Sequence, residues 1–136
     1  MVDVQLHVDD ILSALPHTIQ ALEIDKVDIH SDYCVGIKTY KKNDKALSGH
    51  FGIVPGTRLV EAALQTSVFV PMDNAVEQDF IALEILSAKF RCSVKENDTI
   101  YYKVKRVGMF GTIHEYECIA TNDSGYKVLS CRFRCK

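Results

Sequence analysis

The 136-residue sequence lacks any run of about 18 consecutive apolar residues, the length that a membrane-spanning helix needs. Its first ten residues, MVDVQLHVDD, also lack the basic and then apolar pattern of a secretory signal. We therefore expect neither a membrane span nor a signal peptide. The net charge of −2 lacks the positive excess of nucleic-acid-binding domains, so nothing in it points to nucleic acid as a partner.

Cysteine pairs with the CxxC spacing of zinc and redox sites are absent. The five cysteines are Cys34, Cys92, Cys118, Cys131 and Cys135, an odd number. Cys131 and Cys135 would lie about 13 Å apart along one strand, which is too far for a disulfide. The histidines likewise lack a ligand spacing such as HxxxH. The sequence therefore predicts reduced thiols, a cytoplasmic location and no metal site.

Repeats, linkers and low-complexity segments are also absent, which predicts a single domain over residues 1–136. Residues 22–29 alternate strictly between apolar and polar, as in a half-buried strand. Further strands are predicted over residues 33–40, 80–94, 99–107, 112–120 and 126–135, with His30 and His114 at strand positions. Asp9 or Asp10 would cap a short helix before Pro16. With one longer helix after Pro55, the class is α+β, and a sheet curled around that helix is the simplest packing.

The stretch from Ser48 to Val70 is the one around which we expect the chain to be organised. It opens as a Gly-rich polar loop and becomes, after Pro55-Gly56, a segment that is apolar on nearly every side. Such a helix belongs inside a fold. Glu61 and Gln65 lie four residues apart and therefore on one face of it, and a buried carboxylate must be paired, protonated or used in chemistry.

His50, in the loop just upstream, and Glu61 are candidates for an acid/base pair. Proton transfer by positioned groups accelerates reactions by about a hundred- to ten-thousand-fold. The alternative is a solvated loop histidine and a surface glutamate, and spacing alone does not decide between these two readings.

Several motifs resemble those of the 3-hydroxyacyl-[acyl-carrier-protein] dehydratases of fatty acid synthesis. The specific block is a GHF triplet, a loop and a PGxxxxEAxxQ pattern. It matches Gly49-His50-Phe51, Pro55-Gly56 and Glu61-Ala62 with Gln65. Weaker likenesses are Leu15-Pro16-His17, followed by Asp25 and Val27, and Ala88-Lys89-Phe90, which resembles the start of a later strand in that family.

This resemblance implies a hot-dog fold, in which an antiparallel sheet wraps around a long central helix. It assigns the base that removes the C2 proton to His50 and the acid that protonates the departing C3 hydroxyl to Glu61. Gln65 would orient the site, and a backbone N–H of Gly52 or Gly56 would stabilise the thioester oxygen. Phe51 and Arg58 complete the expected substrate-binding residues.

The resemblance also implies partners. The substrate would be a phosphopantetheine-linked acyl group on acyl carrier protein, and no cofactor is expected. The enzyme would be a homodimer, in which the His and Glu of one site come from different subunits, or a trimer of dimers. Because a carrier protein is acidic, the basic C-terminal residues, including Arg132 and Arg134, are candidates for its docking surface.

Three departures from the family pattern stand out. His50 and Glu61 are 11 positions apart, fewer than in the usual family segment. Arg58 occupies a helix position that is normally apolar, where it would pair with Glu61 and keep it charged, or point to solvent or to a substrate phosphate. The residues after Leu15-Pro16-His17 are Thr18-Ile19-Gln20-Ala21 instead of RYPF, so an aromatic wall of the acyl site is missing.

Two other functions therefore remain open at this point. The shortened loop and Arg58 are compatible with a non-catalytic hot-dog subunit that binds acyl carrier protein or pairs with an active dehydratase. A hot-dog thioesterase would use Glu61 as a base for water, but it leaves the histidine of the GHF triplet without a role.

Overall fold

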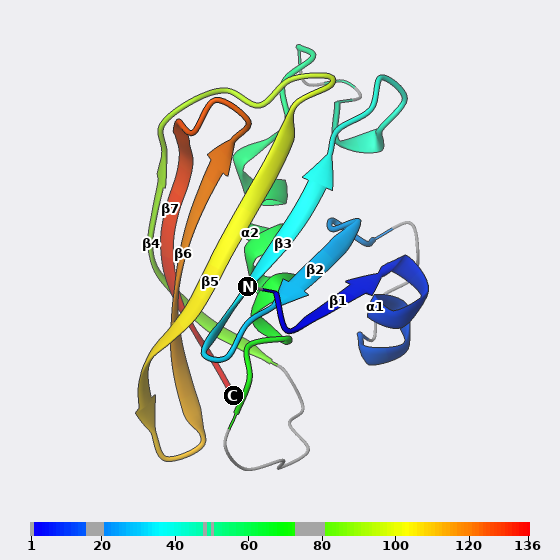
Figure 1. Ribbon diagram of the computed structural model, residues 1–136. Helices are drawn as coiled ribbons and strands as arrows, with labels where there is room; N and C mark the ends of the chain where they lie inside the picture. The colour runs from blue at the N-terminus through cyan, green and yellow to red at the C-terminus, as the bar shows by residue number, and fades with distance from the viewer. Residues whose placement is uncertain (1, 16–20, 48, 50, 73–80) are drawn as a thin grey trace.

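The computed structural model describes residues 2–15, 21–47, 49, 51–72 and 81–136. Within these ranges seven strands form one antiparallel sheet in the order β1-β2-β3-β5-β6-β7-β4 (Figure 1). The strands are β1 (Val4–His7), β2 (Lys26–Ile29), β3 (Tyr33–Thr39), β4 (Ala82–Phe90), β5 (Thr99–Phe110), β6 (Ile113–Asn122) and β7 (Lys127–Cys135). The helices are α1 (Val8–Ala14), a short 3₁₀ turn η1 (Lys45–Leu47) and α2 (Gly56–Ser67).

Helix α2 lies against the inner face of the curved sheet and contacts β3, β4, β5 and β7 (Figure 1). Its residues Leu59, Ala62 and Ala63 are at most 2% exposed, and they join one core with inward side chains of the long strands, such as Tyr102 and Phe133. The apolar stripe of the helix is thus buried against the sheet, as its composition predicts. The expected α+β class and hot-dog fold are confirmed.

The helix approaches β3 so closely that only glycine fits at position 36. A Cβ atom on Gly36 would lie 2.1 Å from Thr66 Oγ1, a distance that no real contact allows. The Thr66 hydroxyl is itself bound, because it donates to the Ala62 carbonyl at 2.7 Å. This contact fixes the depth at which the second half of α2 sits in the sheet.

The start of the chain differs from the sequence-based expectation. Strand β1, which pairs with β2, was not predicted, and the N-cap of α1 is His7 instead of Asp9 or Asp10. The predicted strand over residues 22–29 begins only at Lys26, since the N–H of Glu23 donates to a side chain of α2 and not to a neighbouring strand. His30 follows β2 and stacks on Tyr33, with ring centroids 4.3 Å apart.

Strand β4 is an edge of the sheet, hydrogen-bonded to β7 on one side. The predicted strand over residues 80–94 ends at Phe90, so Ala88-Lys89-Phe90 closes this strand and does not open one. Large apolar side chains stand exposed along it, namely Ile81, Leu83, Ile85, Leu86 and Phe90. An edge of this kind is a template for pairing with another chain.

All five cysteines are free in the structure. In the described part of the chain, neither α1 nor α2 has the length and the apolar character that crossing a membrane would require.

Candidate active site

Helix α2 positions three of the predicted site residues on one face. The helix begins at Gly56 after Pro55, whose carbonyl accepts the N–H of Arg58 at 3.0 Å. Arg58, Glu61 and Gln65 follow at spacings of three and four residues, which places them one above another on the same side. The start of a helix carries the positive end of its dipole, so this end can stabilise a developing negative charge.

Gln65 is the best-anchored residue of this face. Its side chain is buried, and the residue is 2% exposed. The amide oxygen accepts the N–H of Glu23 at 2.8 Å, while Nε2 donates to the Ala21 carbonyl at 2.9 Å and to Glu61 Oε1 at 3.1 Å. Gln65 therefore connects the half-buried Glu61 carboxylate to the backbone of residues 21–23.

Arg58 pairs with a residue that the sequence did not suggest. Its Nη1 donates to Glu23 Oε1 at 2.7 Å, so it neither pairs with Glu61 nor points freely to solvent. The Glu23 side chain is 5% exposed, and the Arg58 side chain is 36% exposed. Sequence reasoning missed Glu23, because in an alternating pattern it occupies a solvent-facing position. The signal that could have found Glu23 is Arg58 itself, because a basic residue at a normally apolar helix position needs an acidic partner.

Burial raises the pKa of Glu23, and the hydrogen bond and charge of Arg58 act against this shift. A second ion pair lies within electrostatic reach, between Lys38 Nζ and Asp44 Oδ2 at 2.9 Å. Burial would raise the pKa of Asp44 as well, but the N–H of Ala46 and the ammonium of Lys38 together hold it below its usual value. The polar face of α2 is thus bordered by two ion pairs, Arg58–Glu23 and Lys38–Asp44, and the charges of each pair affect the pKa of the carboxylate in the other.

Three described residues in and beside the GHF triplet have positive φ angles. Gly49, Phe51 and Gly52 have φ angles of +72°, +54° and +70°, a conformation that is unusual for a residue with a side chain. Phe51 is 98% exposed. His50 lies outside the described residues, so the role of His50 as the base stays a prediction. Pro16, His17 and residues 18–20 also lie outside the described residues.

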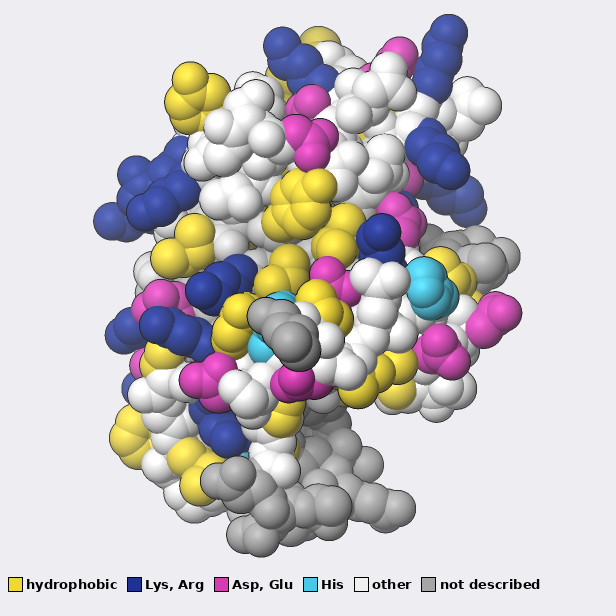
Figure 2. All heavy atoms as spheres, viewed as in Figure 1, with side chains coloured by type: hydrophobic (Ala, Val, Ile, Leu, Met, Phe, Trp, Pro, Cys, Tyr) yellow, Lys and Arg dark blue, Asp and Glu magenta, His cyan; other side chains and the backbone are white. Residues whose placement is uncertain are grey.

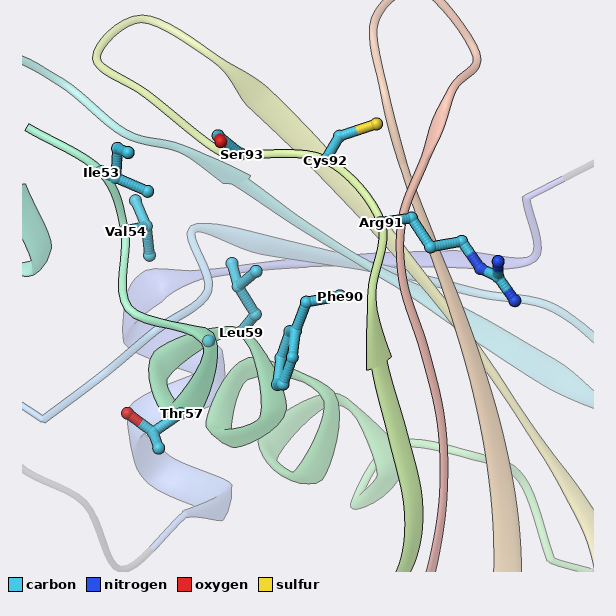
Figure 3. Close-up of a pocket in the computed structure, with 9 residues that line it drawn as sticks. Ile53, Val54, Thr57, Leu59, Phe90, Arg91, Cys92 and Ser93 are labelled. Carbon is cyan, nitrogen blue, oxygen red and sulfur yellow. The ribbon is translucent and has the colours of Figure 1, made fainter.

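A cavity of about 540 Å³ opens where α2 begins, between this helix and the end of β4 (Figure 3). Gly56 and Leu59 contribute the helix side, and the ring of Phe90 lies against the first turn. A Cβ atom on Gly56 would come within 2.7 Å of the Phe90 ring, which explains the glycine. Glu61 is not among the lining residues, but Thr57, which lies four residues before it on the same face of the helix, is one of them.

The structure therefore divides the predicted site residues into groups. Arg58, Glu61 and Gln65 lie together, Gly56 lines the cavity, and Phe51 and Gly52 belong to the exposed loop.

The predicted docking residues of the C-terminal strand are already engaged. Arg132 Nη2 donates to Glu117 at 3.0 Å, and Arg134 Nε donates to Glu115 at 2.9 Å. Arg134 also lies 3.6 Å from Glu84 of the edge strand. These acidic partners offset the basic charge of β7. On the face shown in Figure 2, acidic and basic side chains are likewise interspersed.

Solved structures share the fold. The chain matches the dehydratase heterocomplex ApeI:P from Xenorhabdus doucetiae with a TM-score of 0.75 and 12% identity, over 92% of this chain and 88% of that one. It matches a hypothetical thioesterase with coenzyme A from Streptococcus pneumoniae TIGR4 with a TM-score of 0.71 and 18% identity, over 93% of each chain. At these identities the likeness shows the fold alone.

Curated sequences are much more similar. No family model matches the chain. However, it is 36% identical over 126 residues to the FabZ 3-hydroxyacyl-[acyl-carrier-protein] dehydratase of Brucella melitensis biotype 2, covering 87% of this chain and 80% of the relative. It is 30% identical over 138 residues to the enzyme of the same name from Solibacter usitatus, covering 96% and 85%. The chain belongs to the FabZ family of 3-hydroxyacyl-[acyl-carrier-protein] dehydratases.

Proposed function

We propose that this protein removes water from 3-hydroxyacyl thioesters on acyl carrier protein and releases trans-2-enoyl thioesters, in fatty acid synthesis or a related polyene or polyketide pathway. Family membership supports the reaction. The observation that carries it is the position of Glu61, whose carboxylate is held by the buried amide of Gln65 on the central helix.

The reaction needs two groups on either side of one acyl chain. We assign His50 as the base that removes a proton from C2, and Glu61 as the acid that protonates the C3 hydroxyl as it leaves. The electron pair of the broken C–H bond then forms the C2–C3 double bond, and the products are the enoyl thioester and water. An N–H of Gly52 or Gly56 would stabilise the negative charge on the thioester oxygen during this step.

The homodimer is part of the proposal. The exposed apolar edge of β4 offers a surface that a second copy would cover, and the exposed Phe51 lies in the loop that carries His50. A trimer of dimers, a heterodimer with another hot-dog subunit and the cytoplasmic location stay predictions from the sequence.

Acyl carrier protein remains the proposed partner, but β7 is a weaker candidate for its docking surface than the sequence suggested. Arg132 and Arg134 already face the carboxylates of Glu115 and Glu117. A pair that is compensated in this way attracts a distant acidic protein less than free cations do.

The test is turnover of a short 3-hydroxyacyl-carrier-protein thioester by the wild type, His50→Ala and Glu61→Gln, with mass spectrometry to detect the loss of water. We expect the wild type to dehydrate the substrate and both variants to lose at least about a hundred-fold in kcat. Full activity of either variant would contradict the assignment. A wild type inert across chain lengths would point to a partner subunit, and release of free thiol would point to a thioesterase.

A further inference from the structure

A continuous polar network runs along one face of α2 and ends at the proposed acid. Arg58 Nη1 donates to Glu23 Oε1 at 2.7 Å, and the backbone N–H of Glu23 donates to Gln65 Oε1 at 2.8 Å. Gln65 Nε2 then donates to Glu61 Oε1 at 3.1 Å. Each link is within hydrogen-bonding distance, so Arg58 is connected to Glu61 through a segment that lies 35 or more residues upstream.

The orientation of the Gln65 amide depends on that segment. Its oxygen faces an N–H donor, and its nitrogen faces two oxygen acceptors, the Ala21 carbonyl and Glu61. A flipped amide would place donor against donor and acceptor against acceptor. As long as residues 21–23 stay in place, Gln65 must present an N–H to Glu61.

Residues 21–23 are held against the helix by the bonds to Gln65, by the pair between Glu23 and Arg58, and by the packing of Leu22 in the core. They precede β2 and belong to no strand. Glu23 is 4% exposed, and a carboxylate at this depth is stable only beside a charge or donor that compensates its lost hydration. Arg58 supplies that partner from the same helix that carries Gln65 and Glu61.

We propose that Arg58 and Glu23 are positioning residues, whose ion pair holds residues 21–23 against α2 and so keeps the Gln65 amide directed at Glu61. This inference rests on the proposed function, in which Glu61 is the acid. Packing alone does not require the pair, because apolar side chains of similar volume can often replace a buried ion pair without loss of stability. What apolar replacements would not preserve is the geometry of the network.

The test compares the wild type with the double variant Glu23→Leu/Arg58→Met, which removes both charges and keeps side chains of similar length. The control is Tyr101→Phe/Asp123→Leu, which removes a 3.1 Å side-chain hydrogen bond to a carboxylate at an exposed position outside the proposed site. Two readouts are used: hydrogen exchange of the Gln65 side-chain amide by NMR, which needs no activity, and kcat and KM on the carrier-protein substrate.

In the Glu23→Leu/Arg58→Met variant we expect the Gln65 amide protons to exchange at least about ten-fold faster, because a mobile amide is less protected. We expect kcat to fall about ten- to a hundred-fold, the scale of a misplacement of about 1 Å, while KM stays within about three-fold. Arg58→Lys, which keeps the charge, should recover most of kcat. The control should match the wild type in kcat and in Gln65 exchange.

A double variant with wild-type Gln65 exchange and wild-type kcat would overturn the proposal. Should that variant not fold, Glu23→Gln decides, since it keeps an acceptor for Arg58 but removes the charge. Faster Gln65 exchange with a lower kcat supports the proposal, and unchanged values overturn it. An inert wild type or a fully active Glu61→Gln variant would show that the proposed function has failed. In that case, hydrogen exchange of the Gln65 side-chain amide decides by itself whether Arg58 and Glu23 position this amide.

Discussion

Replacing Gln65 with leucine isolates the contribution of its amide, because leucine has a similar volume and no polar atoms. In the wild type the amide binds the N–H of Glu23 and the carbonyl of Ala21. Leucine leaves the N–H of Glu23 without this bond at a buried position, which costs about 1–3 kcal/mol, whereas the carbonyl of the exposed Ala21 can bind water instead. We expect the free energy of unfolding to fall by about 2 kcal/mol, the middle of the range for one buried group.

Chemical denaturation with guanidinium chloride and calorimetry measure this loss. For a chain of 136 residues, the unfolding entropy converts 2 kcal/mol into a decrease in Tm of about 7 °C. The matched control is Gln5→Leu, since Gln5 donates to Asp28 at an exposed position and its loss should cost less than about 0.5 kcal/mol. A Gln65→Leu variant within about 0.5 kcal/mol of the wild type would refute the reasoning that this amide holds residues 21–23.

Three further predictions follow from other parts of the structure. Ile85→Lys on the exposed edge β4 should shift the protein toward monomer in analytical ultracentrifugation, because a charge opposes strand pairing across this edge. Burial, and to a lesser extent the charge of Arg106, lowers the pKa of His114. The unfolded state therefore binds a proton more readily, and the wild type should lose stability as pH falls below about 6.5. In denaturant titrations, His114→Gln should show a smaller loss of stability between pH 7 and 5. Arg132→Ala/Arg134→Ala should leave KM for the carrier-protein substrate within about three-fold of the wild type, because Glu115 and Glu117 compensate both cations. A ten-fold rise in KM would restore β7 as the docking surface.

Local patterns in the sequence were enough to predict much of the fold. An apolar helix after Pro55-Gly56 and strands with period-two alternation follow from which residues exclude water, and the structure has both. The juxtaposition of Glu61 and Gln65 was also predictable, because a spacing of four residues places two side chains on one face of any helix. The motif resemblance added the hot-dog fold and the family, both of which the structure and the relatives bear out.

The contacts between distant segments were decided by tertiary structure. The pair between Arg58 and Glu23 joins positions 35 apart, and nothing local distinguishes Glu23 from a solvent-facing strand residue. The backbone N–H of Glu23 donates to Gln65 and not to a neighbouring strand, so residues 22–25 do not form the strand that alternation predicts. Periodicity indicates which side of a segment is buried, but it does not indicate which group accepts each hydrogen bond. The charges of Arg132 and Arg134 are compensated only because β6 places Glu115 and Glu117 beside β7, a register that a single sequence does not contain.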